Sequence, residues 1–311
     1  MAARRRGKKK SGRSYAWRYR GRIVACVFVE VIIICALVIM IGWNKGVKEW
    51  FEQFEQPVLK EVDISGINSP NAILMQARGG KILGEINGEA QIYPASMTKI
   101  MTVILGIENF DDLDEKITLT NEMFSGLYEQ DATQAGFQPG EEVRVIDLLY
   151  GAMLPSGAEC CIALADTISG SEADFAELMN KKAGKLGMEN THFCDSTGLH
   201  NPDHYSTVKD IAVLMKYCIK NDTFREIVET SRHSTGVTNI HPDGITYYST
   251  MFKNLSDPTV TGGKILGGKT GYTSEAGHCL VSFAEIEGRE YIFVSAGASG
   301  ADGNTIPHIQ D

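Results

Sequence analysis

The chain has 311 residues, of which 43% are hydrophobic and 22% charged, enough for one large domain or two modest ones with an ample core. Its formal net charge of −9 at pH 7 conceals an asymmetry: residues 1–22 carry ten basic and no acidic side chains, and the remainder carries a net charge of −19. A basic tail is compatible with nucleic-acid binding, but an apolar segment follows it directly, so we expect a membrane partner and no nucleic acid.

The apolar segment, residues 23–43, contains 21 residues and can cross a hydrocarbon layer of roughly 30 Å. The basic flank before it predicts a cytoplasmic N-terminus (1–22) and an extracytoplasmic body. No convincing small-residue cleavage site follows, which favours an uncleaved single-pass anchor in the cell membrane over a removed signal peptide. An amphipathic stretch interrupted by Pro57 then predicts a stalk over 44–62, with the functional domain at 63–311.

The domain begins with a predicted β-hairpin, because two apolar runs flank the turn Ala77-Arg-Gly-Gly80. The middle of the chain shows helical spacing of apolar residues, and the end returns to strands that turn at Glu287-Gly288. The predicted helices are 145–153, 158–168, 171–186 and one capped by Thr207, and the predicted strands are 268–273, 278–285 and 290–296. This order predicts an α/β (α+β) domain in which helices flank one antiparallel sheet and an all-helical lobe is inserted.

A serine and a lysine at the start of a further predicted helix are spaced so that their side chains can meet. Ser96 and Lys99 are three positions apart, so their hydroxyl and amine share one helical face. A serine becomes a nucleophile when a neighbouring base takes its proton, and a buried lysine with a lowered pKa can be that base. The glycine-flanked Lys269-Thr270-Gly271 downstream makes the pair a signal for a penicillin-interacting serine acyl-transfer enzyme.

Five segments of the chain carry recognisable motifs: Tyr93–Thr102, Met153–Ala158, Asp195–His200, His204–Thr207 and Gly268–Thr273. Together they closely resemble the motifs of the serine D-alanyl-D-alanine carboxypeptidases, the low-molecular-mass penicillin-binding proteins, whose fold is β-lactamase/transpeptidase-like. The resemblance covers about residues 62–298.

The resemblance implies roles for individual residues. Ser96 is the acylated nucleophile, Lys99 is its general base, and Ser156 helps to pass the proton to the leaving group. Lys269 and Thr270 face the terminal carboxylate of the substrate.

The same resemblance implies an oxyanion hole formed by the backbone N–H groups of Ser96 and Tyr272. Gly271 and the glycines before Lys269 are then explained by a substrate that lies along this strand, where side chains would obstruct it.

The sequence departs from the family at two places. The second motif ends in Ala158 where the family usually has asparagine, so an amide that would contact the substrate or orient the lysine is missing. The chain also stops at Asp311, shortly after the last predicted strand, which predicts that the final helix of the family is truncated here.

Histidines and cysteines have structural explanations. His200 and His204 flank Asn201-Pro202-Asp203, and these residue types favour a turn over a helix. We therefore expect the two histidines to fix a loop and not to bind a metal. Cys160 and Cys161 lie in an apolar helical run and are expected to be buried free thiols. The resemblance implies neither a metal nor an organic cofactor.

We therefore expect a serine D,D-carboxypeptidase that removes the terminal D-Ala from peptidoglycan stem peptides and is covalently inhibited by β-lactams. A β-lactamase is disfavoured because the Glu-x-x-Leu-Asn pattern that activates the deacylating water is missing. Two alternatives remain open: a receptor or pseudoenzyme that binds β-lactams and muropeptides with little turnover, and a metallopeptidase with the same substrate.

Overall fold

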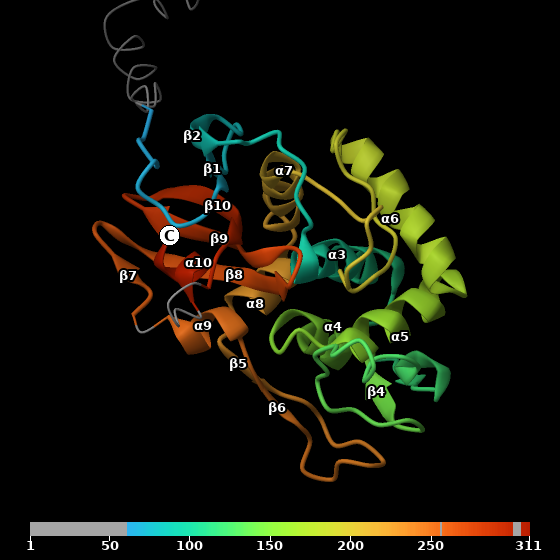
Figure 1. Cartoon of the computed structure of the whole chain (residues 1–311). Coiled ribbons are helices and arrows are strands. Elements are labelled where there is room, and N and C mark those ends of the chain that lie inside the picture. The colour runs from blue at the N-terminus through green and yellow to red at the C-terminus, as the bar shows by residue number, and fades with distance from the viewer. Residues whose placement is uncertain (1–60, 256, 301–305) are drawn as a thin grey trace, which may run out of the picture. The chain divides into compact units, whose positions relative to one another are not determined.

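The computed structural model describes residues 61–255, 257–300 and 306–311 (Figure 1). One six-stranded sheet has the order β2-β1-β10-β9-β8-β7, with every neighbouring pair antiparallel. The strands are β1 (Asn71–Gln76), β2 (Ile82–Ile86), β7 (Thr259–Val260), β8 (Gly263–Thr273), β9 (Gly277–Ile286) and β10 (Arg289–Ala298). The first and last parts of the domain thus pair through β1 and β10 to complete one sheet.

The predicted hairpins are confirmed. Between β1 and β2 the turn uses Gly79 and Gly80 at φ of 85° and 73°, and between β9 and β10 Glu287 and Gly288 adopt φ of 52° and 71°. Two successive residues with positive φ match the right-handed twist of the flanking strands, which is why glycine is common at these positions.

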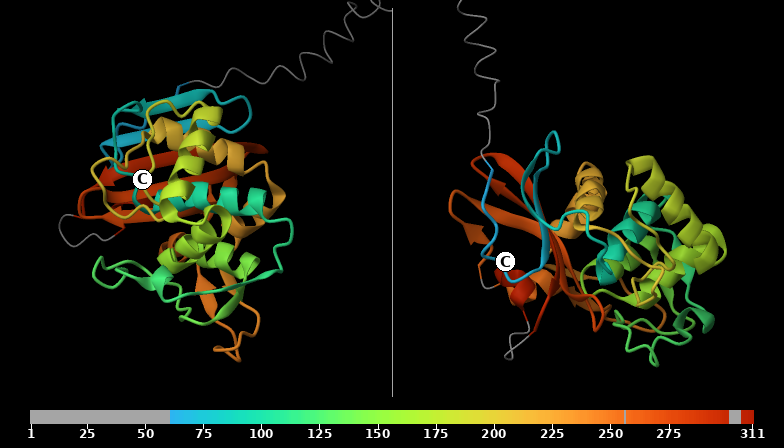
Figure 2. Two further views of the ribbon diagram at one scale, coloured as in Figure 1. Left: turned by 90° about the vertical axis from the view of Figure 1, so that its right-hand side faces the viewer. Right: turned by 45° about the horizontal axis from the view of Figure 1, so that its top comes forward.

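Helices cover one face of the sheet, and a short helix lies on the other (Figure 2). The first group contains α3 (Lys99–Asn109), α7 (Val208–Cys218) and α8 (Asp222–Glu229), and the short helix is α10 (Pro307–Gln310). Phe283 of β9 packs under the guanidinium of Arg225 from α8, with 5.3 Å between that group and the ring centroid. Because side chains alternate along a strand, His278 lies on the opposite face, where its ring meets His308 of α10.

The inserted lobe consists mainly of three helices, as predicted. They are α4 (Val145–Met153), α5 (Ala158–Ser169) and α6 (Glu172–Leu186), which ends at Gly187 as expected. The expectation that the lobe is all-helical is wrong, because it also contains the hairpin β3 (Lys116–Thr118) and β4 (Glu142–Arg144). A second hairpin, β5 (Arg232–Ser234) with β6 (Thr246–Tyr248), precedes α9 (Thr250–Asn254). Three-residue strands are too short to produce a clear alternation in the sequence.

The predicted anchor at 23–43 lies outside the described residues, as does most of the predicted stalk. Within the part of the chain that the structure describes, no helix is both long enough and apolar enough to span a bilayer. At the beginning of that part, the Val62 N–H donates to the Leu83 carbonyl of β2, so the last residue of the predicted stalk already pairs with the edge of the sheet.

Close packing between α8 and β8 gives a stability prediction. A Cβ at Gly267 would lie 2.3 Å from the Val228 carbonyl oxygen, so we expect Gly267→Ala to lower the free energy of unfolding by about 1–3 kcal/mol. Gly184→Ala in α6 is the control, because nothing lies within 4 Å and a helical alanine should add about 0.4–1 kcal/mol. Urea unfolding measures both, and equal stabilities of the two variants would contradict this packing.

Candidate active site

Ser96 and Lys99 meet where the chain enters α3. Ser96 belongs to a single 3₁₀ turn, Ala95–Thr98, and Lys99 is the first residue of the α-helix that follows. The Lys99 amine donates a hydrogen bond of 2.9 Å to the Ser96 hydroxyl oxygen. The structure therefore brings the two groups together, although the serine precedes the α-helix rather than lying within it.

Lys99 is almost fully buried, with 3% of its surface exposed. Its amine also donates to the Thr197 carbonyl at 2.7 Å, so both of these partners are uncharged. Burial lowers the pKa of Lys99, and the more distant Cys161 and Asp195 oppose this shift without cancelling it. A lysine in such surroundings can exist as the neutral amine that a general base requires.

Ser156 lies opposite, in the turn between α4 and α5, and has a φ of 72°. It is not the N-cap of α5, because that position is Gly157 and has no side-chain cap. Instead Ser156 accepts a hydrogen bond of 3.0 Å from the amine of Lys269, which also donates to the Thr270 carbonyl at 2.7 Å. Lys269 is 1% exposed, and burial followed by the nearby charge of Lys99 holds its pKa well below the ordinary value.

Strand β8 passes close to Ser96. A Cβ at Gly271 would lie 3.0 Å from the Ser96 nitrogen, so glycine permits the close approach of the strand to the 3₁₀ turn. A Cβ at Gly268 would lie 2.4 Å from the Val281 carbonyl oxygen. The expectation that the glycines before Lys269 leave room for substrate is therefore wrong, because the neighbouring protein backbone already fills that space.

The rest of the predicted substrate-binding set lies along the same strand. The Thr270 hydroxyl lies 2.7 Å from the hydroxyl of Thr250 on α9, a partner that the sequence analysis did not identify. The Tyr272 side chain is largely exposed and contacts the ring of His278, with 4.6 Å between ring centroids.

A loop behind Lys99, which belongs to the predicted Asp195–His200 motif, supplies one of the partners of the lysine amine. One oxygen of Asp195 accepts hydrogen bonds from the N–H groups of Thr197 and Gly198, each at 2.7 Å. This Asx turn points the Thr197 carbonyl at the lysine amine. A Cβ at Gly198 would lie 1.9 Å from the Ala95 carbonyl oxygen, so the loop packs directly against the turn that carries Ser96.

His204 fixes this loop, as expected. It is 2% exposed, its Nδ1 lies 3.1 Å from the second oxygen of Asp195, and its Nε2 lies 2.9 Å from the Thr98 hydroxyl. Burial would raise the pKa of Asp195, but His204 and the hydrogen bonds from Thr197 outweigh that cost and lower it to about 2. Among the residues that the structure describes, no cluster of histidine, cysteine, aspartate and glutamate could hold a metal ion.

Glu159 holds a second loop beside Ser156. One carboxylate oxygen accepts hydrogen bonds from the N–H groups of Ala135 and Gly136 at 2.6 and 2.9 Å. The N–H of Ala158 donates to the Thr133 carbonyl at 2.8 Å, which fixes the same loop. The next residues in the helix, Cys160 and Cys161, are buried and free, as predicted.

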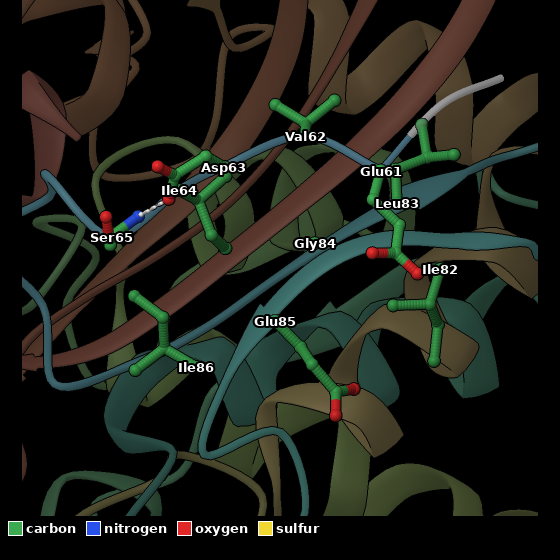
Figure 3. A pocket seen from close by; sticks show the side chains of 10 residues that line it. All are labelled: Glu61, Val62, Asp63, Ile64, Ser65, Ile82, Leu83, Gly84, Glu85 and Ile86. Carbon is green, nitrogen blue, oxygen red and sulfur yellow. Dashed lines mark hydrogen bonds between the residues drawn. The ribbon is translucent and has the colours of Figure 1, made fainter.

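These elements enclose a cleft of about 350 Å³. Its lining comes from the 3₁₀ turn, the Ser156 turn, the loop before β4, helices α9 and α10, and strands β8 and β9. It includes Ser96, Thr133, Ser156, Thr270, Tyr272 and His308. A larger cavity of about 490 Å³ lies at the β2 edge of the sheet and is lined only by residues 61–65 and 82–86 (Figure 3). None of the predicted site residues lines that cavity, so the smaller cleft is the candidate active site.

An antiparallel sheet with an inserted helical lobe, and a serine–lysine pair where the two meet, give the chain the penicillin-binding fold. The crystal structure of the Streptomyces K15 DD-transpeptidase is similar, with a TM-score of 0.70 and 29% identity over 80% of this chain and 98% of that one.

The family is also defined by sequence. The profile of the peptidase S11 family, D-alanyl-D-alanine carboxypeptidase, matches residues 58–300, and the chain belongs to this family. The chain is 35% identical over 231 residues to the D-alanyl-D-alanine carboxypeptidase DacF of Bacillus subtilis, and the match covers 74% of this chain and 57% of that protein. The D-alanyl-D-alanine carboxypeptidase DacC of Escherichia coli is 33% identical to this chain over 262 residues, and the match covers 76% of this chain and 58% of that protein. The chain thus spans a little under three fifths of the length of these two relatives.

The charge of Asp195 gives a pH prediction. Its folded pKa of about 2 lies below the ordinary 3.8, so its contribution to stability is present above about pH 4 and is lost as the pH falls towards 2. We expect Asp195→Asn to cost about 2 kcal/mol at neutral pH and progressively less below about pH 4. Urea unfolding of both proteins at several pH values measures this difference.

Asp203→Asn serves as the control for loss of one negative charge, because it lies in the same loop with an exposed side chain. A stability difference between wild type and Asp195→Asn that stays constant from neutral pH to about pH 2 would contradict the assigned role of the carboxylate.

Proposed function

We propose that the protein is a serine D,D-carboxypeptidase that removes the terminal D-Ala from peptidoglycan stem peptides. The observation that carries the proposal is that Ser96, which accepts a hydrogen bond from the Lys99 amine, lines one cleft with Ser156 and Thr270. Membership of the D-alanyl-D-alanine carboxypeptidase family supplies the substrate class. β-Lactams are expected to acylate the same serine.

In the proposed reaction the neutral amine of Lys99 takes the proton of the Ser96 hydroxyl. The Ser96 oxygen then attacks the carbonyl carbon of the penultimate D-Ala. When the tetrahedral intermediate collapses, the peptide C–N bond breaks and the leaving nitrogen receives a proton through Ser156, so free D-Ala departs. Water, activated by the same lysine, hydrolyses the acyl ester and restores Ser96.

The binding residues complete the proposal. The amine of Lys269 and the hydroxyl of Thr270 face the terminal carboxylate of the substrate. The N–H groups of Ser96 and Tyr272 receive the developing oxyanion, where each such donor contributes about 3 kcal/mol to transition-state stabilisation. The proximity of Gly271 to the Ser96 nitrogen supports this arrangement, because it brings the two donating segments together.

The location of the protein is part of the proposal. An apolar segment at 23–43 behind a basic tail supports a single-pass anchor with the N-terminus in the cytoplasm. The catalytic domain at 63–311 would then lie outside the cell membrane, where its peptidoglycan substrate is found, with residues 44–62 as the stalk.

The first test is Ser96→Ala in the full chain, purified in detergent. We expect loss of covalent labelling by a fluorescent penicillin and a fall of about 10⁴-fold or more in D-Ala release from diacetyl-Lys-D-Ala-D-Ala, because the nucleophile is removed. Ser65→Ala, an exposed serine, is the control. Retention of both activities in Ser96→Ala would reject the proposal, and retention of D-Ala release with sensitivity to a chelator would favour the metallopeptidase.

One observation favours a second candidate, a receptor that is acylated but turns over little. Ala158 occupies the position of the usual asparagine, is 1% exposed, and supplies no side-chain hydrogen bond to the cleft. Acylation needs Ser96 and Lys99, whereas efficient turnover in the family also uses the missing amide.

Ala158→Asn separates the two candidates. If the missing amide limits turnover, we expect the substitution to raise the rate of D-Ala release by about 10-fold, which corresponds to one added hydrogen bond in the transition state. Ala152→Asn in α4, buried elsewhere in the lobe, is the control for a general effect of a new amide. A wild type with ready turnover that Ala158→Asn does not increase would reject the receptor.

A further inference from the structure

Thr250 connects two walls of the cleft. Its backbone N–H donates to the Leu154 carbonyl at 3.1 Å, two residues before Ser156 in the lobe. Its hydroxyl lies 2.7 Å from the hydroxyl of Thr270 on β8. Thr250 is half-buried and lines the same cleft as Ser96. One residue of α9 thus links the turn that carries Ser156 to the strand that carries Thr270.

The fold holds the backbone of α9 on both sides of Thr250. Its neighbours Ser249 and Met251 are both buried. A Cβ at Gly268 would lie 2.7 Å from the Met251 sulfur, so the helix packs directly against β8. Threonine branches at Cβ, which restricts its side chain to few rotamers. The Thr250 hydroxyl is therefore held against Thr270 by packing as well as by the hydrogen bond.

A bound anion would fix the direction of the bond between the two hydroxyls. Among the described residues, Thr250 is the only side chain that is hydrogen-bonded to the Thr270 hydroxyl. A carboxylate accepts hydrogen bonds and donates none, so Thr270 must turn its single hydroxyl proton towards such a ligand. Thr250 is then the donor to the Thr270 oxygen, and each bond in a chain of this kind strengthens the next.

The Lys269 amine does not orient the same hydroxyl. It donates to the backbone carbonyl of Thr270 at 2.7 Å and to the Ser156 hydroxyl at 3.0 Å. We propose that Thr250 is a positioning residue of the carboxylate site: its hydroxyl donates to Thr270 and thereby directs the Thr270 proton to the terminal carboxylate of the substrate. This inference deepens the proposed function and rests on it for the place of that carboxylate.

The first test compares ligands with and without the carboxylate charge. Thr250→Val keeps the shape of the side chain but replaces its hydroxyl by a methyl group, and Thr250→Ser restores the hydroxyl. We expect Thr250→Val to lower kcat/KM for diacetyl-Lys-D-Ala-D-Ala by about 10-fold. The C-terminal amide of that peptide should be affected far less, because a hydrogen bond to a charged acceptor is stronger. Thr250→Ser should recover most of the preference for the acid, whereas an equal effect of Thr250→Val on acid and amide, or none on either, would overturn the inference.

A double-mutant cycle tests whether Thr250 acts through Thr270. Thr270→Val should lower kcat/KM for the acid by at least as much as Thr250→Val, and the double variant should be no slower than Thr270→Val alone. Losses that multiply in the double variant would overturn the inference, because Thr250 would then act independently. If a melting curve shows that Thr250→Val does not fold, Thr250→Ala takes its place with the same expected outcomes.

Thr246→Val is the matched control. It also breaks a pair of hydroxyl groups, since the Thr246 hydroxyl lies 2.9 Å from that of Ser234, but this pair belongs to the β5–β6 hairpin and does not line the cleft. The preference for the acid should be unchanged in this variant. A loss of preference equal to that of Thr250→Val would overturn the inference.

Acylation separates this inference from the proposed function. The second-order rate of acylation by benzylpenicillin and by its methyl ester, followed by mass spectrometry, does not depend on turnover. A protein that is acylated but releases no D-Ala would refute the carboxypeptidase. The inference would still hold if Thr250→Val slowed acylation by the acid much more than by the ester, and would be refuted if both slowed equally.

Discussion

The arrangement of the site depends on two lysine amines that are buried without a carboxylate bonded to either. Lys99 donates to Ser96 and the Thr197 carbonyl, and Lys269 donates to Ser156 and the Thr270 carbonyl. An ammonium in such surroundings loses more hydration energy than neutral hydrogen bonds return, so burial lowers both pKa values. The fold supplies this desolvation by closing the helical lobe over the edge of the sheet, which makes the packing of the two parts a condition for the chemistry.

That packing requires close contact between backbones. Gly271 brings β8 to the Ser96 nitrogen, and Gly198, with a φ of 81°, brings the Asp195 loop to the Ala95 carbonyl. The turn that carries Ser96 is thus held between a strand from the end of the domain and a loop from its middle. The buried Asp195–His204 pair fixes that loop from behind, so the position of the Thr197 carbonyl is set by charge and hydrogen bonding as well as by packing.

The sequence predicted the features that depend on local patterns. Helix α4 begins and ends at the predicted residues, Thr207 caps α7 through the N–H of Asp210, and the proximity of Ser96 and Lys99 follows from their spacing. Contacts between distant segments could not be predicted. The hydroxyl of Thr98 pairs with His204 and that of Thr250 with Thr270, and neither pairing leaves a periodic signal in the chain. The reason for the glycines before Lys269 could not be predicted either, because the atoms that leave no room for a side chain there are backbone atoms of other elements.

The departure from the family motif at Ala158 does not disturb the Ser156 turn. Loss of an asparagine side chain at Ala158 could loosen the Ser156 turn, but the turn remains fixed by backbone contacts, with the Gly157 N–H bonded to the Gly151 carbonyl and the Ala158 N–H to Thr133. Glu159 adds two further bonds to the adjacent loop, and burial raises the pKa of its carboxyl. The missing amide therefore leaves Ser156 in place to receive the Lys269 hydrogen bond. What the substitution changes is the side chain beside Ser156, since the backbone bonds that hold the turn do not involve it.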